Sequence, residues 1–445
     1  MDRQDRSAHA RRSRTLYPQG TTLTHAFPCW WEGYDHDVTR ALPDSANTVV
    51  VGAGITGIVT AIELARAGQD VLVIDANHVG AGATGASLGV LSTPAAGVGF
   101  GDPDEMVFGR PRKLWHRDRV AAQRYLLRLI EESGRDCSLR KGAVLLAPTA
   151  RNAERLAASV KARNAYYDSS DVMVGPEQLA QEAGGYVSEL FAGGLIMSDA
   201  HFVQPARMIV GLARLAMAKG VVICERTEVV DVQPKKGGFR VRTNGGDVTA
   251  VNVFLATGGY GHAGSRYLRD RTLGLPSIVA ASEEIPVDEV RDICRSGRVL
   301  MVNRFRTYTC RPSEDGRRIV LGGPVSQMPG TPADNARRLH EYFTRLFPDL
   351  TGVEFTHCWV GMVAATRDGA GHSGINNGVR YAVGASGLVS SADAGRRMAQ
   401  SILHDDAAED EGFPRWPMRD SEHLWWRAAA LADRWRDLVG KSRLR

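Results

Sequence analysis

The sequence predicts an α/β fold, of the two-domain α+β kind, in which the two domains are interleaved along the chain. The first observation is an apolar run, Asn47–Val51, that leads into the pattern G-x-G-x-x-G and then into a helical pattern ending near Gly68. The second is an alternation of apolar and polar residues over 228–255, interrupted by glycine-rich turns, which predicts an antiparallel meander. The third is a series of strand-like runs between 276 and 321, which predicts a second, mostly antiparallel sheet.

The glycine pattern consists of Gly52, Gly54 and Gly57, and each glycine has a different task in a strand–turn–helix unit. The first permits the tight turn, the second lets the backbone approach a diphosphate, and the third lets the helix pack against the strand. The helix begins at Ile55 and Thr56, and the N–H groups at a helix N-terminus favour phosphate oxygens. We therefore expect these five residues to form a dinucleotide-binding turn.

A second apolar strand, Val71–Ile74, follows the helix and ends at Asp75 and Ala76. In this motif a carboxylate about 20 residues after the third glycine accepts a hydrogen bond from a ribose hydroxyl. Asp75 lies close to that distance after Gly57. An acidic residue at this place disfavours a 2′-phosphate, so the pattern argues against NADP.

Composition and cysteine usage argue against several classes of protein. The chain has 445 residues, 43% hydrophobic and 24% charged, and a formal net charge of +5, which is ordinary for a globular protein of two or three domains and indicates no nucleic-acid partner. Its six cysteines are scattered without C-x-x-C spacing, so we expect reduced thiols, a cytoplasmic protein and no metal site. No secretion signal and no apolar run long enough for a membrane span is expected.

The order of the expected elements divides the chain into four parts. The C-terminal part includes an amphipathic helical pattern, Leu424–Val439, which either docks on the core or forms a homodimer contact through its tryptophans. The predicted parts are an N-terminal extension (1–45), a nucleotide-binding domain (46–105, 196–262 and 355–405), a substrate domain (106–195 and 263–354) and a C-terminal linker with the amphipathic helix (406–445).

From about Asn47 to Leu403 the chain resembles the D-amino-acid-oxidase-like superfamily of FAD-dependent amine oxidoreductases, nearest to the γ-glutamylputrescine oxidase, glycine oxidase and sarcosine oxidase branch. The resemblance implies a Rossmann-like FAD-binding domain with a parallel sheet and a β-meander, interleaved with a substrate domain built on a mostly antiparallel sheet. Four blocks carry it: the glycine turn with the strand ending at Asp75, the small-residue loop 80–85, the pair Thr227–Val229 and Leu255–Gly258, and the stretch from Trp359 through Asp368 to Gly384–Gly387.

The resemblance also implies which residues beyond the glycine turn contact FAD. Relatives of the sarcosine oxidase type link the flavin to a cysteine near the position of Gly361, where this chain has no cysteine, so we expect noncovalent FAD. The further expected contacts are Gly82, Ala83, Thr84, Ser87, Val229, Ala256, Thr257, Gly258, Gly384, Ser386 and Gly387.

The chain departs from the family pattern mostly near the flavin ring. Ala86-Ser87 replaces Arg-Asn after the small-residue loop, and Leu388-Val389 replaces His-Gly. Val363 stands where α-amino-acid oxidases of this family place an arginine for the substrate carboxylate, which disfavours a plain D-amino acid or glycine.

The resemblance implies oxidation of a C–N bond of an amine or N-substituted amino compound by hydride transfer to the flavin, followed by hydrolysis of the imine. Oxygen or an unknown electron acceptor then reoxidises the flavin. Two alternatives stay open: a biosynthetic tailoring flavoenzyme that performs desaturation or oxygenation, and a catalytically inactive flavoprotein subunit of a complex.

Candidate catalytic residues are Tyr308, Arg311 and Trp359, with Tyr260 and Arg367 behind them. Glycine-oxidase-like relatives hold the substrate acid with an arginine in a similar strand, so Arg311 is expected to be an anion anchor. The alternative for Arg311 is a solvated arginine at the end of a strand.

Overall fold

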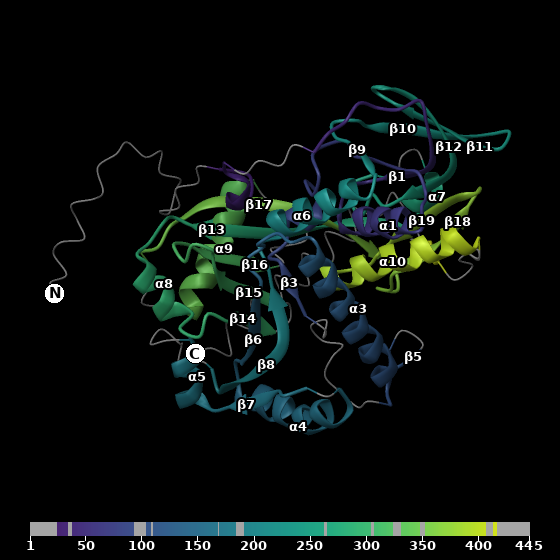
Figure 1. The fold of residues 1–445 in the computed structure, drawn as a ribbon. Helices are drawn as coiled ribbons and strands as arrows, with labels where there is room; N and C mark the ends of the chain where they lie inside the picture. Colours follow the sequence, from purple (N-terminus) through teal and green to yellow (C-terminus); the bar gives the residue numbers. More distant parts are fainter. Residues whose placement is uncertain are drawn as a thin grey trace, which may run out of the picture.

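The computed structural model describes residues 25–33, 38–92, 104–107, 110–167, 169–183, 191–261, 265–303, 307–323, 331–347, 352–405 and 413–415. Figure 1 shows two sheets, one beside the helices α1 and α10 and the other carrying α9. The mixed α/β architecture with parallel and antiparallel strands confirms the predicted fold class. The predicted C-terminal amphipathic helix lies outside the described residues.

The first sheet contains the predicted nucleotide-binding unit and the meander. Its order is β10-β11-β12-β1-β2-β9, with β19 beside β12 and β18 beside β19. Strands β9, β2, β1, β12 and β19 run parallel, whereas β10, β11 and β12 pair antiparallel. The strands are β1 (Ser45–Val51), β2 (Val71–Ile74), β9 (Val222–Cys224), β10 (Val229–Lys235), β11 (Gly238–Thr243), β12 (Gly246–Leu255), β18 (His372–Asn376) and β19 (Val379–Val383).

Four helices form one hydrophobic core with this sheet: α1 (Ile55–Arg66), α3 (Arg112–Glu132), α6 (Pro205–Ala218) and α10 (Leu388–His404). Helix α1 buries a mostly apolar face in this core, and the buried Thr60 hydroxyl donates to the Gly395 carbonyl of α10 at 2.9 Å. Helix α3 packs its apolar side in the same core, although its residues fall within the predicted substrate domain.

The second sheet has the order β17-β13-β16-β15-β14-β6-β8-β3, with β7 beside β8. It is antiparallel except for the β6–β14 pair. Helix α9 (Pro332–Leu346) packs on β13, β16 and β17. The strands are β3 (Val90–Leu91), β6 (Arg140–Ala147), β7 (Val172–Val174), β8 (Gly193–Phe202), β13 (Thr272–Ser282), β14 (Val299–Asn303), β15 (Thr307–Pro312), β16 (Ile319–Gly323) and β17 (Phe355–Thr366).

Smaller elements complete the described part of the chain. They are the 3-10 turn η2 (Cys29–Trp31), the helices α2 (Ala83–Ala86), α4 (Ala150–Tyr167), α5 (Pro176–Ala183), α7 (Arg266–Arg269) and α8 (Val287–Ile293), and the short strands β4 (Met106–Val107) and β5 (Arg110–Pro111).

Sheet membership differs from the predicted domain division at three strands. Strands β3, β8 and β17 belong to the second sheet, whereas their residues lie in segments predicted for the nucleotide-binding domain, apart from the first three residues of β8. Strand β17 pairs with β13 along its whole length, from Thr272 opposite Thr366 to Ser282 opposite Phe355. Local patterns predict that a segment is a strand, but the partner strand decides the sheet to which it belongs. The domain boundaries themselves stay a prediction.

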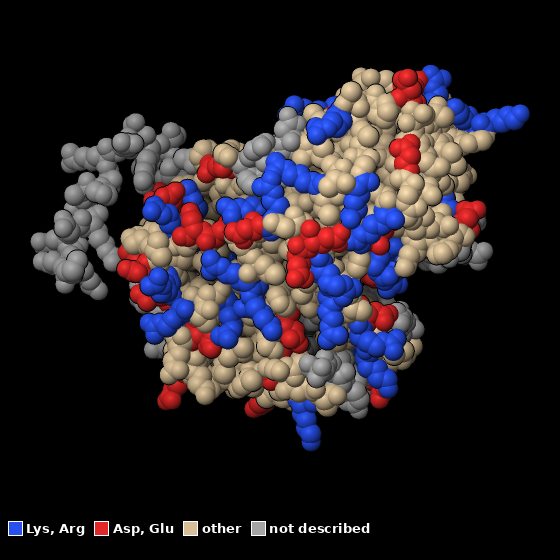
Figure 2. Space-filling view, in the orientation of Figure 1, with Lys and Arg blue, Asp and Glu red and all other residues tan. Residues whose placement is uncertain are grey.

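Among the described residues, no helix is both long enough and apolar enough to cross a membrane. Figure 2 shows lysine and arginine interspersed with aspartate and glutamate over the visible face. This mixture of signs fits the small formal net charge of +5.

We predict that Gly57→Ala destabilises the fold. A Cβ at this position would overlap the carbonyl oxygen of Gly52 and press on Val50, both parts of the strand–turn unit that cannot move aside cheaply. The expected loss in the free energy of unfolding is about 3 kcal/mol, because the added atom overpacks against backbone. Gly175→Ala is the matched control, since a Cβ there meets nothing within 4 Å. Denaturant unfolding of both variants measures the difference, and equal stabilities would contradict the prediction.

Candidate cofactor site

An elongated pocket of about 650 Å³ lies between the two sheets. Its floor is formed by the loops that follow the carboxyl ends of β1, β2, β12 and β19, and its far side by β13 and β17. Ligands of open α/β sheets bind outside the carboxyl ends of the strands, and the volume is in the range of about 300–1,000 Å³ for small-molecule sites. The pocket is therefore the candidate functional site.

The glycine turn brings bare backbone to the pocket. Gly52 has a φ of +111°, and a Cβ on it would lie 2.6 Å from the carbonyl oxygen of Ala256, so both the conformation and the neighbour require glycine. Gly54 has an ordinary extended conformation, and a Cβ on it would meet only the Thr84 hydroxyl at 3.3 Å. The space in front of Gly54 therefore belongs to the pocket.

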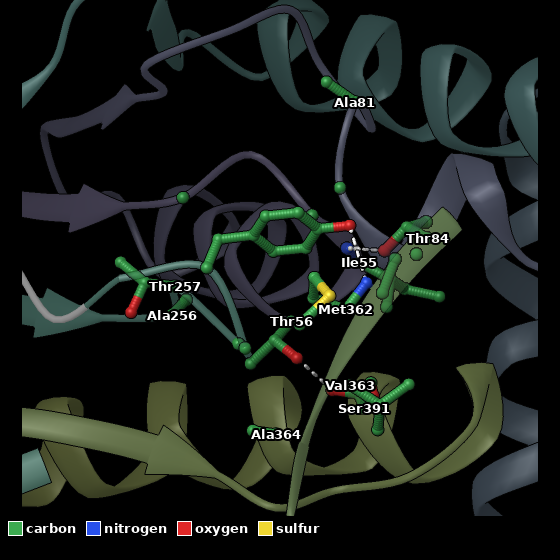
Figure 3. A pocket seen from close by; sticks show the side chains of 18 of the residues that line it. Ile55, Thr56, Ala81, Thr84, Ala256, Thr257, Met362, Val363, Ala364 and Ser391 are labelled. Atoms are coloured by element: carbon green, nitrogen blue, oxygen red, sulfur yellow. Dashed lines mark hydrogen bonds between the residues drawn. The ribbon is translucent and has the colours of Figure 1, made fainter. Parts of the chain in front are cut away.

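The N-termini of two helices converge on this space. In Figure 3 the backbone N–H of Ile55, in the first turn of α1, donates to the Thr84 hydroxyl at 3.1 Å. The Thr56 hydroxyl donates to the carbonyl oxygen of Ser391 in α10 at 3.1 Å, which ties the two helix ends together. Because Thr84 accepts the N–H of Ile55, its own proton can be donated to a phosphate oxygen. The arrangement favours an anionic group beside Gly54.

Asp75 lines the pocket at the carboxyl end of β2. Its Oδ2 accepts from the N–H of Ala53 at 2.7 Å, and its Oδ1 accepts from the N–H of Asn77 at 2.8 Å. Burial raises the pKa of the Asp75 carboxyl, while these two hydrogen bonds act in the opposite direction. Each oxygen retains a lone pair, so the carboxylate can accept from the hydroxyls of a ribose.

Two tryptophans hold the small-residue loop in place. The Trp30 Nε1 donates to the carbonyl oxygen of Gly85 at 2.7 Å, and the Trp359 Nε1 donates to the carbonyl oxygen of Ala86 at 2.9 Å. The two indole rings meet edge to face, with centroids 4.8 Å apart. These carbonyls end the short helix α2, so the tryptophans satisfy acceptors that the helix itself leaves open.

The end of the pocket beside β13 and β17 is mostly apolar, with the hydroxyls of Ser277 and Tyr260 as its polar side-chain groups among the described residues. Met362, Val363 and Ala364 line it from β17 (Figure 3). Leu88, in the loop after α2, and Val279 of β13 complete this lining. The Tyr260 hydroxyl accepts from the Met362 N–H at 2.8 Å. Within the described part of the chain, no arginine, lysine or histidine lines the pocket.

Seventeen of the residues expected to contact FAD line this pocket, and Gly57 does not, because it packs beneath the turn against Gly52. The roles of these residues toward FAD stay predictions. Those in the pocket are Gly52, Gly54, Ile55, Thr56, Asp75, Ala76, Gly82, Ala83, Thr84, Ser87, Val229, Ala256, Thr257, Gly258, Gly384, Ser386 and Gly387.

The three candidate catalytic residues do not line the pocket. Tyr308 stacks on Tyr342 of α9, with ring centroids 3.5 Å apart. Arg311 is 1% exposed, pairs with Glu314 at 3.1 Å and lies over the ring of Trp30, so it is not a solvated arginine either. Trp359 donates its Nε1–H to the Ala86 carbonyl of the small-residue loop and does not reach the pocket. Their roles as catalytic residues stay predictions, with no pocket contact to support them.

Several lining residues were missed from the sequence. Ser391 and Met362 contribute through backbone atoms, to which sequence patterns are blind. Trp30 does not line the pocket, but its Nε1 donates to the Gly85 carbonyl of the small-residue loop, and no pattern in the sequence indicates this contact.

We predict that Gly54→Val abolishes FAD binding while the protein still folds. The valine side chain would point into the pocket where a diphosphate is expected, and its backbone conformation suits any residue. The purified variant should be colourless, with an unfolding midpoint close to that of the wild-type apoprotein. Gly54→Ala, whose Cβ meets only Thr84, should show weakened binding. Full flavin content in the valine variant would contradict this assignment of the pocket.

We predict that Trp30→Phe and Trp359→Phe each weaken FAD binding. Removing either N–H leaves a carbonyl of α2 without its donor, at a cost of about 1–2 kcal/mol. Because the free loop can move away to relieve this cost and the FAD-bound loop cannot, affinity should fall roughly five- to thirtyfold. Quenching of flavin fluorescence measures the dissociation constants. Trp115→Phe on α3, outside the pocket lining, is the control. Unchanged affinity in both loop variants would show that the tryptophans do not position the site.

Comparisons with known proteins agree with this geometry. Residues 47–401 match the family model described as DAO, FAD dependent oxidoreductase. The chain is similar to a probable oxidoreductase OrdL of Rhizobium meliloti, at 27% identity over 76% of this chain and 78% of the relative. It is similar to the gamma-glutamylputrescine oxidoreductase of Escherichia coli, at 24% identity over 84% of this chain and 87% of the relative.

Among solved structures, the fold is similar to glycine oxidase from Geobacillus kaustophilus, with a TM-score of 0.68, 20% identity and coverage of 84% of this chain and 100% of that chain. The family model covers well over half of the chain and includes every block that forms the pocket. The chain therefore belongs to the DAO family of FAD-dependent oxidoreductases.

Proposed function

We propose that this protein oxidises a C–N bond of an amine or an N-substituted amino compound, with noncovalently bound FAD as the acceptor of the hydride. The hydride leaves the carbon, the nitrogen lone pair forms the new double bond, and water hydrolyses the resulting imine. The observation that carries the proposal is a dinucleotide pocket whose far end, beside β17, is mostly apolar and holds no cationic side chain among the described residues.

The residues of the pocket fit FAD. The bare backbone at Gly52 and Gly54 and the N-terminus of α1 suit a diphosphate, and Asp75 suits a ribose. When bound, FAD supplies the two-electron acceptor that no side chain of the protein provides. Noncovalent binding is supported by the cysteines, since all six are free and none lines the pocket. Cys358 points away from it into the core, where burial raises its pKa to about 12.

An amine substrate is favoured by the activities of similar proteins, which include gamma-glutamylputrescine oxidoreductase and glycine oxidase. The pocket lining favours the first of these over the second. A carboxylate on the reacting carbon needs a cation or several donors when it is buried. The described residues at this end offer the hydroxyls of Tyr260 and Ser277 but no cationic side chain. The better match is an amine without a carboxylate on the carbon that is oxidised.

The apolar lining also prepares the amine for reaction. A free alkylamine has a pKa near that of lysine, about 10.4, so at neutral pH most of it carries a proton and lacks the lone pair needed for hydride loss. Desolvation beside Met362 and Val363 favours the neutral form. Lowering the pKa by about three units costs roughly 4 kcal/mol, which lies within the range of burial effects.

Anaerobic mixing of the flavin-loaded protein with a substrate panel tests the proposal. One set contains simple alkylamines, N-alkylated amines and monoacylated diamines, and the other contains glycine, sarcosine and D-alanine. We expect the flavin absorption band to bleach with at least one amine of the first set and to remain with all three amino acids. The Gly54→Val protein serves as the blank.

Two other results would contradict the proposal. If no amine bleaches the flavin, amine oxidation is wrong and an inactive subunit or a tailoring reaction is favoured. If only the amino acids bleach the flavin, it is wrong that the lack of a cationic side chain in the described lining disfavours a substrate carboxylate. Admitting air after bleaching identifies the acceptor, because rapid return of the band indicates oxygen and slow return indicates another acceptor.

A further inference from the structure

A cluster of two histidines and a glutamate lies outside the cofactor pocket, where the N-terminal segment crosses β17. His25 forms a parallel bridge with His357: its N–H donates to the Thr356 carbonyl, and its own carbonyl accepts from the Cys358 N–H, both at 3.0 Å. Glu32, at the other end of the same segment, turns back to the pair. Figure 1 shows this segment beside β17.

The three side chains lie close together. The His357 Nε2 lies 3.0 Å from the Glu32 Oε1, and the His25 Nε2 lies 3.8 Å from the same oxygen. The two imidazole rings stack, with centroids 4.5 Å apart. One ligand atom from each residue lies within 4.8 Å of the other two.

We propose that His25, Glu32 and His357 bind a divalent transition-metal ion of the Zn²⁺ class. Two imidazoles and a carboxylate are a donor set that zinc and its neighbours accept, with a fourth position left for water. Metal–ligand bonds of about 2.0–2.1 Å place the donors of a tetrahedral site roughly 3.3 Å apart. The separations of 3.0 and 3.8 Å to Glu32 lie on either side of that value. Because the two imidazole rings are stacked, the exposed His25 ring must turn about its side-chain bonds so that both Nε2 lone pairs face the ion.

Hydrogen bonding alone leaves this cluster incomplete. At 3.8 Å the His25 Nε2 is too far from the Glu32 oxygen for a hydrogen bond. A cation between the three donors would satisfy all of them at once. Glu32 and His25 keep about 40% of their side-chain surface exposed, which gives an ion a path of entry, whereas His357 is buried.

Neighbouring side chains fix the orientation of the buried His357 ring. The Thr356 hydroxyl lies 3.0 Å from the His357 Nδ1, and it also contacts the Ser282 carbonyl and Arg318 at 3.3 Å. Metal-binding histidines use their second nitrogen in this way, and the partner sets the ring orientation. Arg318 is a nearby positive charge that opposes an ion, but it is itself paired with Glu284 at 3.3 Å.

Spacing along the sequence could not indicate this site, because His357 lies 325 residues beyond Glu32. The absence of a metal-ligand motif led to the expectation of no metal site, and only the bridge between His25 and β17 brings the donors together. An ion here would join the segment that carries Trp30 to the strand that carries Trp359. It would thereby brace the pair that holds α2.

Calorimetric titration of the untagged, full-length protein with Zn²⁺ after chelator treatment and dialysis tests the proposal. We expect one saturable site that is weakened at least about 100-fold in His25→Ala and at least about tenfold in Glu32→Gln. Both side chains are part-exposed, so these variants should fold. The matched controls are His404→Ala at the end of α10 and Glu341→Gln on α9, which should bind like the wild type.

Thermal unfolding gives a second readout. Saturating Zn²⁺ should raise the unfolding midpoint of the wild type and of both controls, but not of His25→Ala, because a ligand that binds only the folded state stabilises it. Lack of saturable binding to the wild type would overturn the proposal. Binding with the same affinity in His25→Ala and Glu32→Gln would also overturn it, since the ion would then lie elsewhere on the chain.

Discussion

The site depends on one steric constraint, the close contact of backbone with backbone around the first glycine turn. Gly57 of α1 touches the carbonyl of Gly52, Gly52 touches Ala256 at the end of β12, and Gly395 of α10 touches the carbonyl of Thr56. At none of these contacts is there room for a side chain. Two helix N-termini and the ends of four parallel strands are therefore held at one place, and the pocket is the space left between them.

The second sheet takes part in this arrangement through α2. Gly361 of β17 leaves room for Ala86, and the neighbouring Trp359 donates to the Ala86 carbonyl. Trp30 holds the preceding carbonyl from the N-terminal segment, which bridges to the same strand at His357. Residues from three distant parts of the sequence thus determine where the small-residue loop lies relative to the glycine turn.

The sequence was informative where function rests on backbone geometry. The glycine turn, Asp75 and the small-residue loop have spacings that only a few conformations satisfy, and the residues predicted from them line the pocket, apart from the structural Gly57. It was uninformative where strand pairing decides. Tyr308 and Arg311 lie on β15, which β14 and β16 enclose within the second sheet, so their side chains meet α9 and Trp30 rather than the pocket. Neither local pattern nor residue type contains that information.

One physical property of the pocket bears on both reactivity and selectivity. A low-dielectric lining such as Met362, Val363 and Leu88 penalises charge of either sign. An ammonium group can respond by losing its proton to water before it enters, at a cost of roughly 4 kcal/mol for three pKa units. A carboxylate bound beside it has a far lower pKa, about 4, and would have to take up a proton at neutral pH or enter charged, at an effective cost of several kcal/mol without a paired cation. Under the proposed function, a lining that favours a reactive neutral amine would therefore disfavour an amino acid, with no repulsive side chain needed among the described residues.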